Sequence, residues 1–493
     1  MTKKAWERER ALRRSAVPVD RRDKDSEWYE PGFTAPAGDD LIAEFWESRV
    51  PGSFAPEIPY QEMVQAQGNK GYDVSAAEEL LEEGIRLHKS GDTDGLRVLT
   101  ARLWNALINA PKITASNYFA CEHPTGWENV RAAMGGMQEQ KPAEPPAELE
   151  KHILDGWVGQ LAGAYFGTAI EGYTGEQIAA VYGEVDDYIT EPETMNDDVV
   201  YELVVLDVFE LMGREITSDA LGLEWVRQIP FGWSAEWAAL RNLSMGIFPP
   251  ESGSFQNPYS DWIGVQMRAM ISGLLSPGWP LEAARLAYID GVVSHAANGV
   301  YGGIAAAVMT SLAFVRSDVR QVLEETAGFI PQRSEYAAVY AEALDIVKNE
   351  NTPAEAWCRL DTRLERYNWI HAYPNITAVI VSLWFGQGDM TESFRLLAKC
   401  GMDVDCSGGL AGTVLGVMHG VPAKWAEPIG DRLETYLKGK EVLSIQELAE
   451  KTARLVKKKP GRPFLTTAAL NICLNNGYAE SGCPLRQPFC LTL

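Results

Sequence analysis

Apolar residues recur three and four positions apart along most of the chain beyond residue 150. This spacing is typical of helices that bury one face, whereas the strict alternation typical of strands is scarce. The stretches with helical spacing are residues 153–165, 199–211, 281–293, 303–314, 336–348, 376–384, 390–399, 409–418 and 445–455. We therefore predict an all-α domain over residues 151–460, with roughly ten to fourteen helices.

Two of the predicted helices are rich in glycine and alanine. They read GGIAAAVMTSLA at residues 302–313 and GGLAGTVLG at residues 408–416. Such small residues allow two backbones to approach closely. Because no segment repeats at a fixed period, a compact orthogonal multi-helix bundle is expected rather than a repeat solenoid.

The two ends of the chain differ from this central region. Residues 1–25 are densely charged, which predicts a solvated charged arm or an exposed helix. Residues 26–136 have a globular pattern, and Ser75 with Glu78 forms a capping-box motif, so we expect a small helical N-terminal region. Residues 137–150 are rich in proline and indicate a linker, and residues 461–493 are interpreted as a C-terminal extension.

Residues 233–262 are unusually aromatic for a segment that also contains Pro, Gly and Ser. Its aromatic side chains are Trp233, Trp237, Phe248, Phe255, Tyr259 and Trp262. A loop of this composition is either pinned to the core by its rings or faces a ligand. The sequence leaves both alternatives open.

The formal net charge of −24 argues against a nucleic-acid partner. Such a charge repels phosphate backbones, and the chain has none of the basic footprint typical of nucleic-acid-binding proteins. The longest apolar windows, residues 303–315 and 376–385, are shorter than the roughly 18–20 residues that cross a bilayer. Since the N-terminal segment also lacks the apolar core of a secretory signal, we expect no membrane partner and no export.

The chain has seven cysteines, and no pair of them has C-x-x-C spacing. An odd number without metal-binding spacing favours reduced thiols, and therefore a cytoplasmic location. A disulfide among Cys473, Cys483 and Cys490 is the alternative.

Two acidic clusters each precede a predicted helix. Asn196, Asp197 and Asp198 come before an apolar helical stretch, and Asp403 and Asp405 come before a glycine-rich one. Either cluster alone can be a helix cap. Together they form an oxygen-rich set that needs cations to stay ionised, which favours Mg²⁺ or a similar hard ion. No His or Cys cluster competes for the metal, so zinc is disfavoured.

Five motifs follow one another along the chain. They are GQLAGAYFGTAIEG at 159–172, NDDVV at 196–200, IGVQMRAMISGLLSPG at 263–278, SHAANGVYGG at 294–303 and GMDVDCSGGLAGTVLGVMHG at 401–420. In this order they resemble the motifs of the ADP-ribosylglycohydrolase family, to which dinitrogenase reductase-activating glycohydrolase belongs. The resemblance covers residues 152–455 and implies an all-α ADP-ribosylglycohydrolase-like fold that hydrolyses ADP-ribose linkages with a pair of Mg²⁺ ions.

The resemblance also implies roles for individual residues. The expected catalytic residues are Glu171, which would position water and substrate, and Asp198. The expected metal ligands are Asn196, Asp197, Asp198, Asp403, Asp405 and Cys406. The expected substrate-binding residues are Gly264, Gln266, Arg268, Ser294, His295 and Tyr301. A glycosidic bond breaks through an oxocarbenium-like state, which a positioned water and stabilising charges favour.

The chain departs from the family pattern at several positions. Ala164 stands where the family has Asp, Asn196 where it has Thr or Ser, and Val199 and Val404 where it has Thr. Cys406 replaces Ser or Thr, and a thiol is a poor ligand for Mg²⁺. Both one ion and two ions are therefore compatible with the sequence.

The leading hypothesis is a Mg²⁺-dependent glycohydrolase that cleaves an ADP-ribosyl or related ribosyl bond in a small molecule or a modified protein. One alternative is an enzyme of the same fold that hydrolyses another N-glycoside or a nucleoside. The other is a non-catalytic ADP-ribose binder. The retention of so many mutually repelling carboxylates favours an enzyme over a binder.

Overall fold

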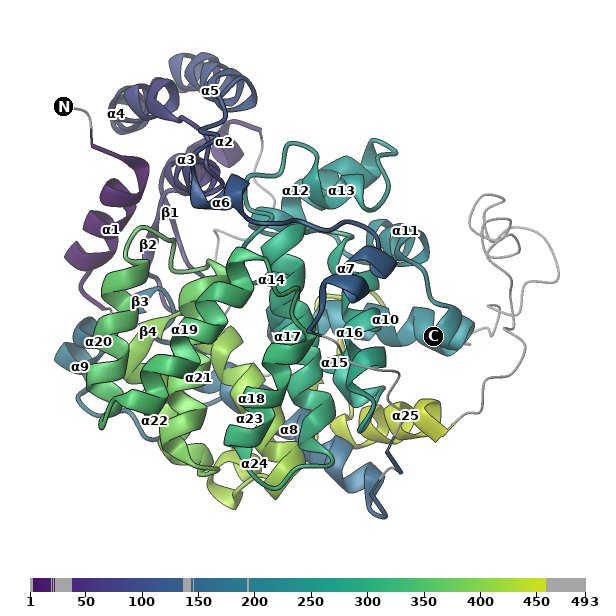
Figure 1. Cartoon of the computed structure of the whole chain (residues 1–493). Helices are drawn as coiled ribbons and strands as arrows, with labels where there is room; N and C mark the ends of the chain where they lie inside the picture. Colours follow the sequence, from purple (N-terminus) through teal and green to yellow (C-terminus); the bar gives the residue numbers. More distant parts are fainter. Residues whose placement is uncertain are drawn as a thin grey trace, which may run out of the picture.

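A computed structural model describes residues 3–18, 20, 22, 38–135, 143–144, 146–192 and 195–457 of the 493-residue chain. Within these residues almost all regular structure is helical, and the strands are two residues long (Figure 1). The predicted all-α class is confirmed. Among the helices of this part of the chain, none combines the length and the apolar composition that a bilayer crossing requires.

Most of the N-terminal region lies along the upper left of the body in Figure 1, whereas residues 127–133 lie apart from it, beside residues 280–291. Its elements are α1 (Ala5–Ser15), α2 (Gly38–Trp46), β1 (Ser48–Arg49), β2 (Pro56–Glu57), α3 (Pro59–Asn69), α4 (Ser75–Ser90), α5 (Thr93–Ile108), α6 (Asn117–Ala120) and α7 (Trp127–Ala133). Residues of helices α2, α3, α4 and α5 form one hydrophobic cluster, which also contains Ala235, Tyr259 and Trp262 from the aromatic-rich residues 233–262. The rings of Tyr259 and Trp262 are therefore part of a core shared with the N-terminal region, whereas Phe248 and Phe255 are exposed.

The rest of the described chain forms the body of the molecule. Its helices are α8 (Leu149–Thr168), α9 (Gly175–Tyr182), α10 (Asp197–Met212), α11 (Ser218–Gln228), α12 (Ser234–Ser244), α13 (Glu251–Ser254), α14 (Gly264–Arg268), α15 (Met270–Leu274), α16 (Pro280–Gly291), α17 (Ala297–Ala313), α18 (Val319–Thr326), α19 (Glu335–Asn349), α20 (Pro353–Leu364), α21 (Ala372–Gly386), α22 (Met390–Cys400), α23 (Val404–His419), α24 (Ala423–Ile429) and α25 (Ile445–Lys457). Its strands are β3 (Tyr173–Thr174), β4 (Gly401–Met402), β5 (Leu433–Glu434) and β6 (Val442–Leu443).

Each stretch with helical spacing lies largely within one of these helices. The expected number of helices was too low, because α8 to α25 include short helices such as α13 and α14 that are too brief to show a full apolar period. The expectation of a loop over residues 233–262 was also wrong in part. Residues 234–244 form α12, whose buried face carries Ala235, Ala238 and Leu243 at helical spacing.

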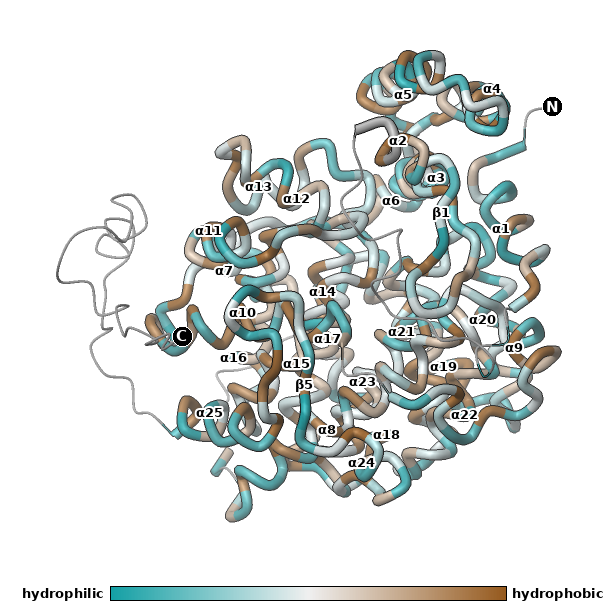
Figure 2. The backbone as a smooth tube through the Cα atoms, turned by 180° about the vertical axis from the view of Figure 1, so that it is seen from behind, coloured by the Kyte–Doolittle hydropathy of each residue, from teal (hydrophilic) through white to brown (hydrophobic). Residues whose placement is uncertain are grey.

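Helices α8 and α23 cross at very close range in the centre of the body. Gly159 and Gly163 of α8 lie against the backbone carbonyls of Gly412 and Gly408 of α23, so that a Cβ atom on either α8 glycine would overlap them. The glycine-rich sequence of α23 permits this contact. Peripheral helices instead bury one face, and α25 accordingly alternates between polar and apolar colours along its length in Figure 2.

The charged N-terminal segment differs from the arm or exposed helix that its composition suggested. Residues 5–15 form α1, and Arg8, Glu9 and Arg13 are buried. Charged side chains are accommodated there because they pair: Arg13 Nε lies 3.2 Å from Glu9 Oε1 and Arg13 Nη2 lies 3.5 Å from Glu62 Oε1. Helix α1 therefore packs against the body.

The capping-box assignment at the start of α4 was wrong. The Ser75 hydroxyl donates to Asp73, and Glu78 is buried, where it accepts a hydrogen bond from the backbone N–H of Ala5. The domain boundaries themselves stay predictions. Residues 137–142 and 145 of the expected linker, the C-terminal extension at 461–493, and Cys473, Cys483 and Cys490 lie outside the described residues.

Candidate active site

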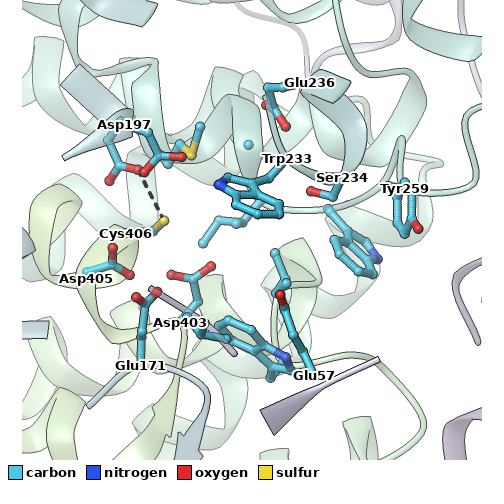
Figure 3. Close-up of a pocket in the computed structure, with 18 of the residues that line it drawn as sticks. Glu57, Glu171, Asp197, Trp233, Ser234, Glu236, Tyr259, Asp403, Asp405 and Cys406 are labelled. Atoms are coloured by element: carbon cyan, nitrogen blue, oxygen red, sulfur yellow. Dashed lines mark hydrogen bonds between the residues drawn. The ribbon is translucent and has the colours of Figure 1, made fainter. Parts of the chain in front are cut away.

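Three segments that are far apart in the sequence bring acidic side chains to one cavity (Figure 3). These acidic residues are Glu171 after α8, Asp197 and Asp198 at the start of α10, and Asp403 and Asp405 at the start of α23. Strands β3 and β4 hold the first and third segments together, with Tyr173 paired to Met402. The backbone N–H of Gly172 also donates to the Met402 carbonyl at 2.8 Å.

The acidic side chains form two groups that could each hold a metal ion. In one group, atoms of Asp198, Asp405 and Cys406 lie within 4.8 Å of one another. In the other, atoms of Glu171, Asp403 and Asp405 do so. All are buried, and Asp405 belongs to both groups, so the two candidate positions are adjacent.

Several carboxylate oxygens in this cluster have no hydrogen-bond partner among the described residues. They are Asp198 Oδ2, Asp403 Oδ1 and Asp405 Oδ1. A buried oxygen that carries charge is costly to leave unpaired, and hard divalent cations bind such oxygens. The donor set therefore fits Mg²⁺ or a similar ion at either group, with Cys406 as the one weak ligand.

The pKa shifts of the acidic side chains also indicate that this cluster suits a bound cation. Burial, and then the charge of Asp405, raise the pKa of Asp198 and of Asp403 well above the usual range. Burial and the charges of Asp405 and Asp403 likewise raise the pKa of Glu171, and burial raises the pKa of Asp197 to about 7. These shifts mean that the ionised cluster is unfavourable without a counter-charge.

Asn196, an expected metal ligand, serves as the N-cap of α10. Its side-chain oxygen accepts the backbone N–H of Asp198 at 2.8 Å, and its Nδ2 donates to Asp405 Oδ2 at 3.4 Å. It does not line the cavity. Asp197 lines the cavity beside the two groups but belongs to neither.

Of the expected substrate-binding residues, the cavity wall includes Gly264 alone. The other five are buried, and Nε2 of Gln266 and Nε2 of His295 have no hydrogen-bond partner among the described residues. The hydroxyl of Tyr336 donates to Gln266 Oε1, and the Tyr301 hydroxyl donates to the backbone carbonyl of Pro124. Gln266, Arg268, Ser294, His295 and Tyr301 are not among the residues of the cavity wall, and their substrate-binding role stays a prediction.

Arg268 does not line the cavity itself, but it holds Glu236, which does. Its Nη1 donates to Glu236 at 2.7 Å, its Nε to Asp290 at 2.8 Å and its Nη2 to the Ser294 hydroxyl at 2.8 Å. Ser294 in turn bonds to His295, whose pKa is lowered by burial and by the charge of Arg268. This network fixes Glu236, which does line the cavity.

The sequence model described as ADP-ribosylglycohydrolase matches residues 145–461. The chain belongs to the ADP-ribosylglycohydrolase family. No curated protein gave a significant match. Among solved structures, an "ADP-ribosylglycohydrolase-related protein complex" is similar to this chain with 18% sequence identity and a TM-score of 0.41, over 63% of this chain and 98% of that one.

In this ADP-ribosylglycohydrolase-family chain, Cys406 occupies a distinctive position. Its thiol donates to Asp198 Oδ1 at 3.5 Å. Burial and the neighbouring carboxylates raise the pKa of the Cys406 thiol well above its usual range. The side chain therefore behaves as a weak hydrogen-bond donor to the Asp198 carboxylate.

Several residues that line the cavity were not indicated by the sequence. Among these residues are Phe45, Val50, Pro51, Glu57, Pro59 and Glu62 from the N-terminal region, Glu236 of α12, and Trp369 and Ile370 before α21. No motif marks them, because each lies in an ordinary local pattern. The aromatic density of residues 233–262 was the one useful signal, since Trp233, Tyr259 and Trp262 do line the cavity.

Direct contacts join the N-terminal region to the loop that carries Glu171. The Tyr173 hydroxyl donates to the Ser53 carbonyl at 3.2 Å. Gly52 has a φ of 78° and packs against Thr168, so closely that a Cβ atom would overlap that side chain. The N-terminal region is thus one wall of the candidate active site.

Proposed function

We propose that this protein is a metal-dependent hydrolase that cleaves an ADP-ribosyl or related ribosyl glycosidic bond. The observation that carries the proposal is the meeting of Glu171, Asp198, Asp403 and Asp405 at one cavity. One oxygen each of Asp198, Asp403 and Asp405 has no hydrogen-bond partner among the described residues. Membership of the ADP-ribosylglycohydrolase family supports the reaction class.

Asp198, Asp403 and Asp405 would hold the metal, with Glu171 beside them. When bound, Mg²⁺ supplies Lewis-acid chemistry and helps to orient the sugar and the attacking water. The fit rests on the unpaired buried oxygens and on the adjacency of the two groups.

Glu171 is the best-placed residue for proton transfer. It is buried at the cavity, follows α8 directly, and has a raised pKa because of burial and the charges of Asp405 and Asp403. A carboxyl group in such a setting can hold a proton near neutral pH and exchange it with water or a leaving group. We assign it the positioning of water and the accompanying proton transfer.

The test is the release of free sugar from a panel of glycosides by the full chain, with Mg²⁺ and after chelation. The panel holds ADP-ribosylated arginine and serine peptides, ADP-ribose and simple ribonucleosides. Turnover of at least one compound should require Mg²⁺ and should fall by about 10²-fold or more in Glu171→Gln and Asp403→Asn. The exposed Glu176→Gln serves as the control.

A second candidate function is the hydrolysis of a different N-glycoside by the same fold. It is favoured by the walls from the N-terminal region and from residues 233–262, which lie beside the carboxylate cluster. If this second function is correct, the protein should hydrolyse nucleosides of the panel and should not hydrolyse the ADP-ribosylated peptides. Metal-dependent binding with no turnover of any compound would instead indicate a binder.

A reducing compartment such as the cytoplasm is proposed for the protein. Cys121, Cys358, Cys400 and Cys406 are free thiols, which suits such a compartment. Mass spectrometry of the protein with and without reduction tests this, because a stable disulfide elsewhere in the chain would contradict it.

A further inference from the structure

A second cavity is lined by residues of α1, α9, α20 and α22, which lie on the same side of the body in Figures 1 and 2. Its volume of about 690 Å³ falls within the roughly 300–1,000 Å³ typical of small-molecule sites. Thr174 of β3 and Met402 of β4 line this second cavity, whereas Glu171 and Asp403 line the active-site cavity. The two cavities therefore share the short segments that form β3 and β4.

The wall of the second cavity contains basic side chains, unlike the described wall of the active site. Its charged residues are Arg10, Arg14, Glu176, Asp361, Glu392, Arg395 and Lys399. Ion pairs within the wall or with the neighbouring Glu184 involve most of them. Arg14 and Glu176, which are both exposed, are the two wall residues for which no ion pair is found in the described chain.

Two guanidinium groups of this wall have N–H groups available to a ligand. Arg10 donates from Nη2 to Asp361 at 2.8 Å, but its buried Nε has no hydrogen-bond partner among the described residues. Arg14 lies one turn further along α1, and therefore on the same face of that helix. Guanidinium groups bind phosphate oxygens through charged hydrogen bonds, so this pair favours an anionic ligand.

The first residues of two helices line the same cavity. Gly175 and Glu176 begin α9, and Pro353 and Ala354 begin α20. Helix N-termini carry backbone N–H groups without intrahelical partners and a partial positive charge, both of which stabilise a bound anion. The helix starts therefore favour the same ligand charge as the arginines do.

Trp357 adds an aromatic surface to the wall. Its side chain is half-buried on α20 and lies four residues from both Pro353 and Asp361, which line the cavity too. Apolar side chains continue the wall, and these are Val381, Leu396 and Met402. An indole ring in such surroundings suits the stacking of a flat ring from a ligand.

We infer that this second cavity binds a small molecule that joins an aromatic ring to a phosphate group, as a nucleoside monophosphate does. The phosphate would bind Arg14, Nε of Arg10 and the helix starts, and the ring would stack on Trp357. The ligand would lie apart from the metal-binding carboxylates, so the site is an addition to the proposed function and does not depend on it.

Calorimetric titration of the full chain with adenosine monophosphate tests this. EDTA is present, so that no divalent ion joins the nucleotide to the active-site carboxylates. Adenosine and inorganic phosphate are the partial probes. The site variants are Arg14→Ala and Trp357→Ala, and the matched control is Arg102→Ala, at an exposed position of α5.

A second measurement locates the nucleotide without any variant. Cys358 is an exposed thiol in the wall of the second cavity, whereas the half-buried Cys121 lines neither cavity. Alkylation by iodoacetamide, followed by mass spectrometry, gives the reaction rate of each thiol with and without the nucleotide. A bound ligand should slow the reaction of Cys358 several-fold and leave that of Cys121 unchanged.

Adenosine monophosphate should bind at least about tenfold more tightly than adenosine or phosphate alone, because only it meets both the ring and the guanidinium groups. Each site variant should weaken this binding about 5- to 10-fold, and Arg102→Ala should not change it. Absence of binding to the unaltered protein would overturn the inference. Binding that leaves the alkylation of Cys358 unchanged would also overturn it, because the nucleotide would then lie elsewhere. No sugar release is measured, so failure of the proposed hydrolase activity does not affect either outcome.

Discussion

Arg13 of α1 donates a hydrogen bond from Nη1 to the backbone carbonyl of Gly172, at 2.7 Å. Gly172 directly follows Glu171, so the N-terminal helix is tied to the loop that presents the proposed catalytic carboxyl group. The same guanidinium pairs with Glu9 and Glu62. One buried side chain therefore links α1, Glu62 of the cavity wall and the loop that carries Glu171.

Replacing Arg13 should destabilise the protein strongly. Arg13→Ala leaves Glu9 and Glu62 buried without their base, and removal of one partner from a buried ion pair costs about 3–5 kcal/mol. Urea unfolding measures the effect. Arg14→Ala, at the next and exposed position of α1, is the matched control and should change stability by less than about 0.5 kcal/mol. Similar losses in both variants would contradict the assigned role.

Gly167 should set the position of Asp405. A Cβ atom at Gly167 would overlap the backbone nitrogen and Cα of Asp405, so Gly167→Ala must push α8 away from the start of α23. We expect a loss of at least about 2 kcal/mol of stability and weakened Mg²⁺ binding. At Gly409 the nearest atom would be 3.7 Å away, so Gly409→Ala is the tolerated control on α23. Calorimetric Mg²⁺ titration and urea unfolding of both variants check this.

Asp405→Asn should have opposite effects with and without metal. Without divalent ions, loss of one charge relieves repulsion on Asp198, Asp403 and Glu171, so stability should rise by about 1 kcal/mol or more. Mg²⁺ at 100 times its dissociation constant should stabilise the unaltered protein by about 2.7 kcal/mol and the variant much less. Thermal unfolding with Mg²⁺ or a chelator measures both, with the exposed Asp186→Asn as control. Equal stabilisation of both proteins by Mg²⁺ would place the ion elsewhere.

Cys406→Ser should strengthen Mg²⁺ binding. The hydroxyl oxygen is a harder ligand than the thiol sulfur, and Cys406 is within 4.8 Å of Asp198 and Asp405 in the candidate metal group. The dissociation constant for Mg²⁺ should fall by about 3- to 10-fold, which is roughly 0.7–1.4 kcal/mol. Cys400→Ser, at a buried cysteine outside the cavity, should leave Mg²⁺ affinity unchanged. Weaker binding by Cys406→Ser would show that the thiol is not a substitute for an oxygen ligand.

Glu62 should make stability depend on pH. Burial, and then the charge of Glu57, raise its pKa from 4.5 to about 8. The native state therefore binds more protons than the unfolded state between these values, and the free energy of unfolding falls as pH rises through them, by up to about 1.4 kcal/mol per pH unit.

Glu62→Gln removes this dependence, so its stability relative to the unaltered protein should increase steadily from pH 5 to pH 8. Urea unfolding across this range provides the measurement, with Glu79→Gln, at an exposed position of α4, as the control. A constant difference between Glu62→Gln and the unaltered protein at all pH values would contradict the raised pKa.

The sequence by itself determined the helical class and the acidic residues that meet at the cavity. Helical spacing is a local property, so stretches such as 376–384 and 409–418 could be assigned without knowledge of their neighbours. Asp198, Asp403 and Asp405 were also recognisable, because carboxylates before helices form short motifs.

Only the tertiary structure decided what surrounds those carboxylates. Arg268 stands in a family motif, yet it pairs with Asp290 and Glu236 behind the wall, while Glu57 and Glu62 stand in no motif and line the cavity. Which side of a helix faces a cavity depends on how distant segments dock, and on which buried charges find partners there. The contacts of Arg268 with Asp290 and Glu236 span 22 and 32 positions, and that of Arg13 with Gly172 spans 159, so no local pattern records them.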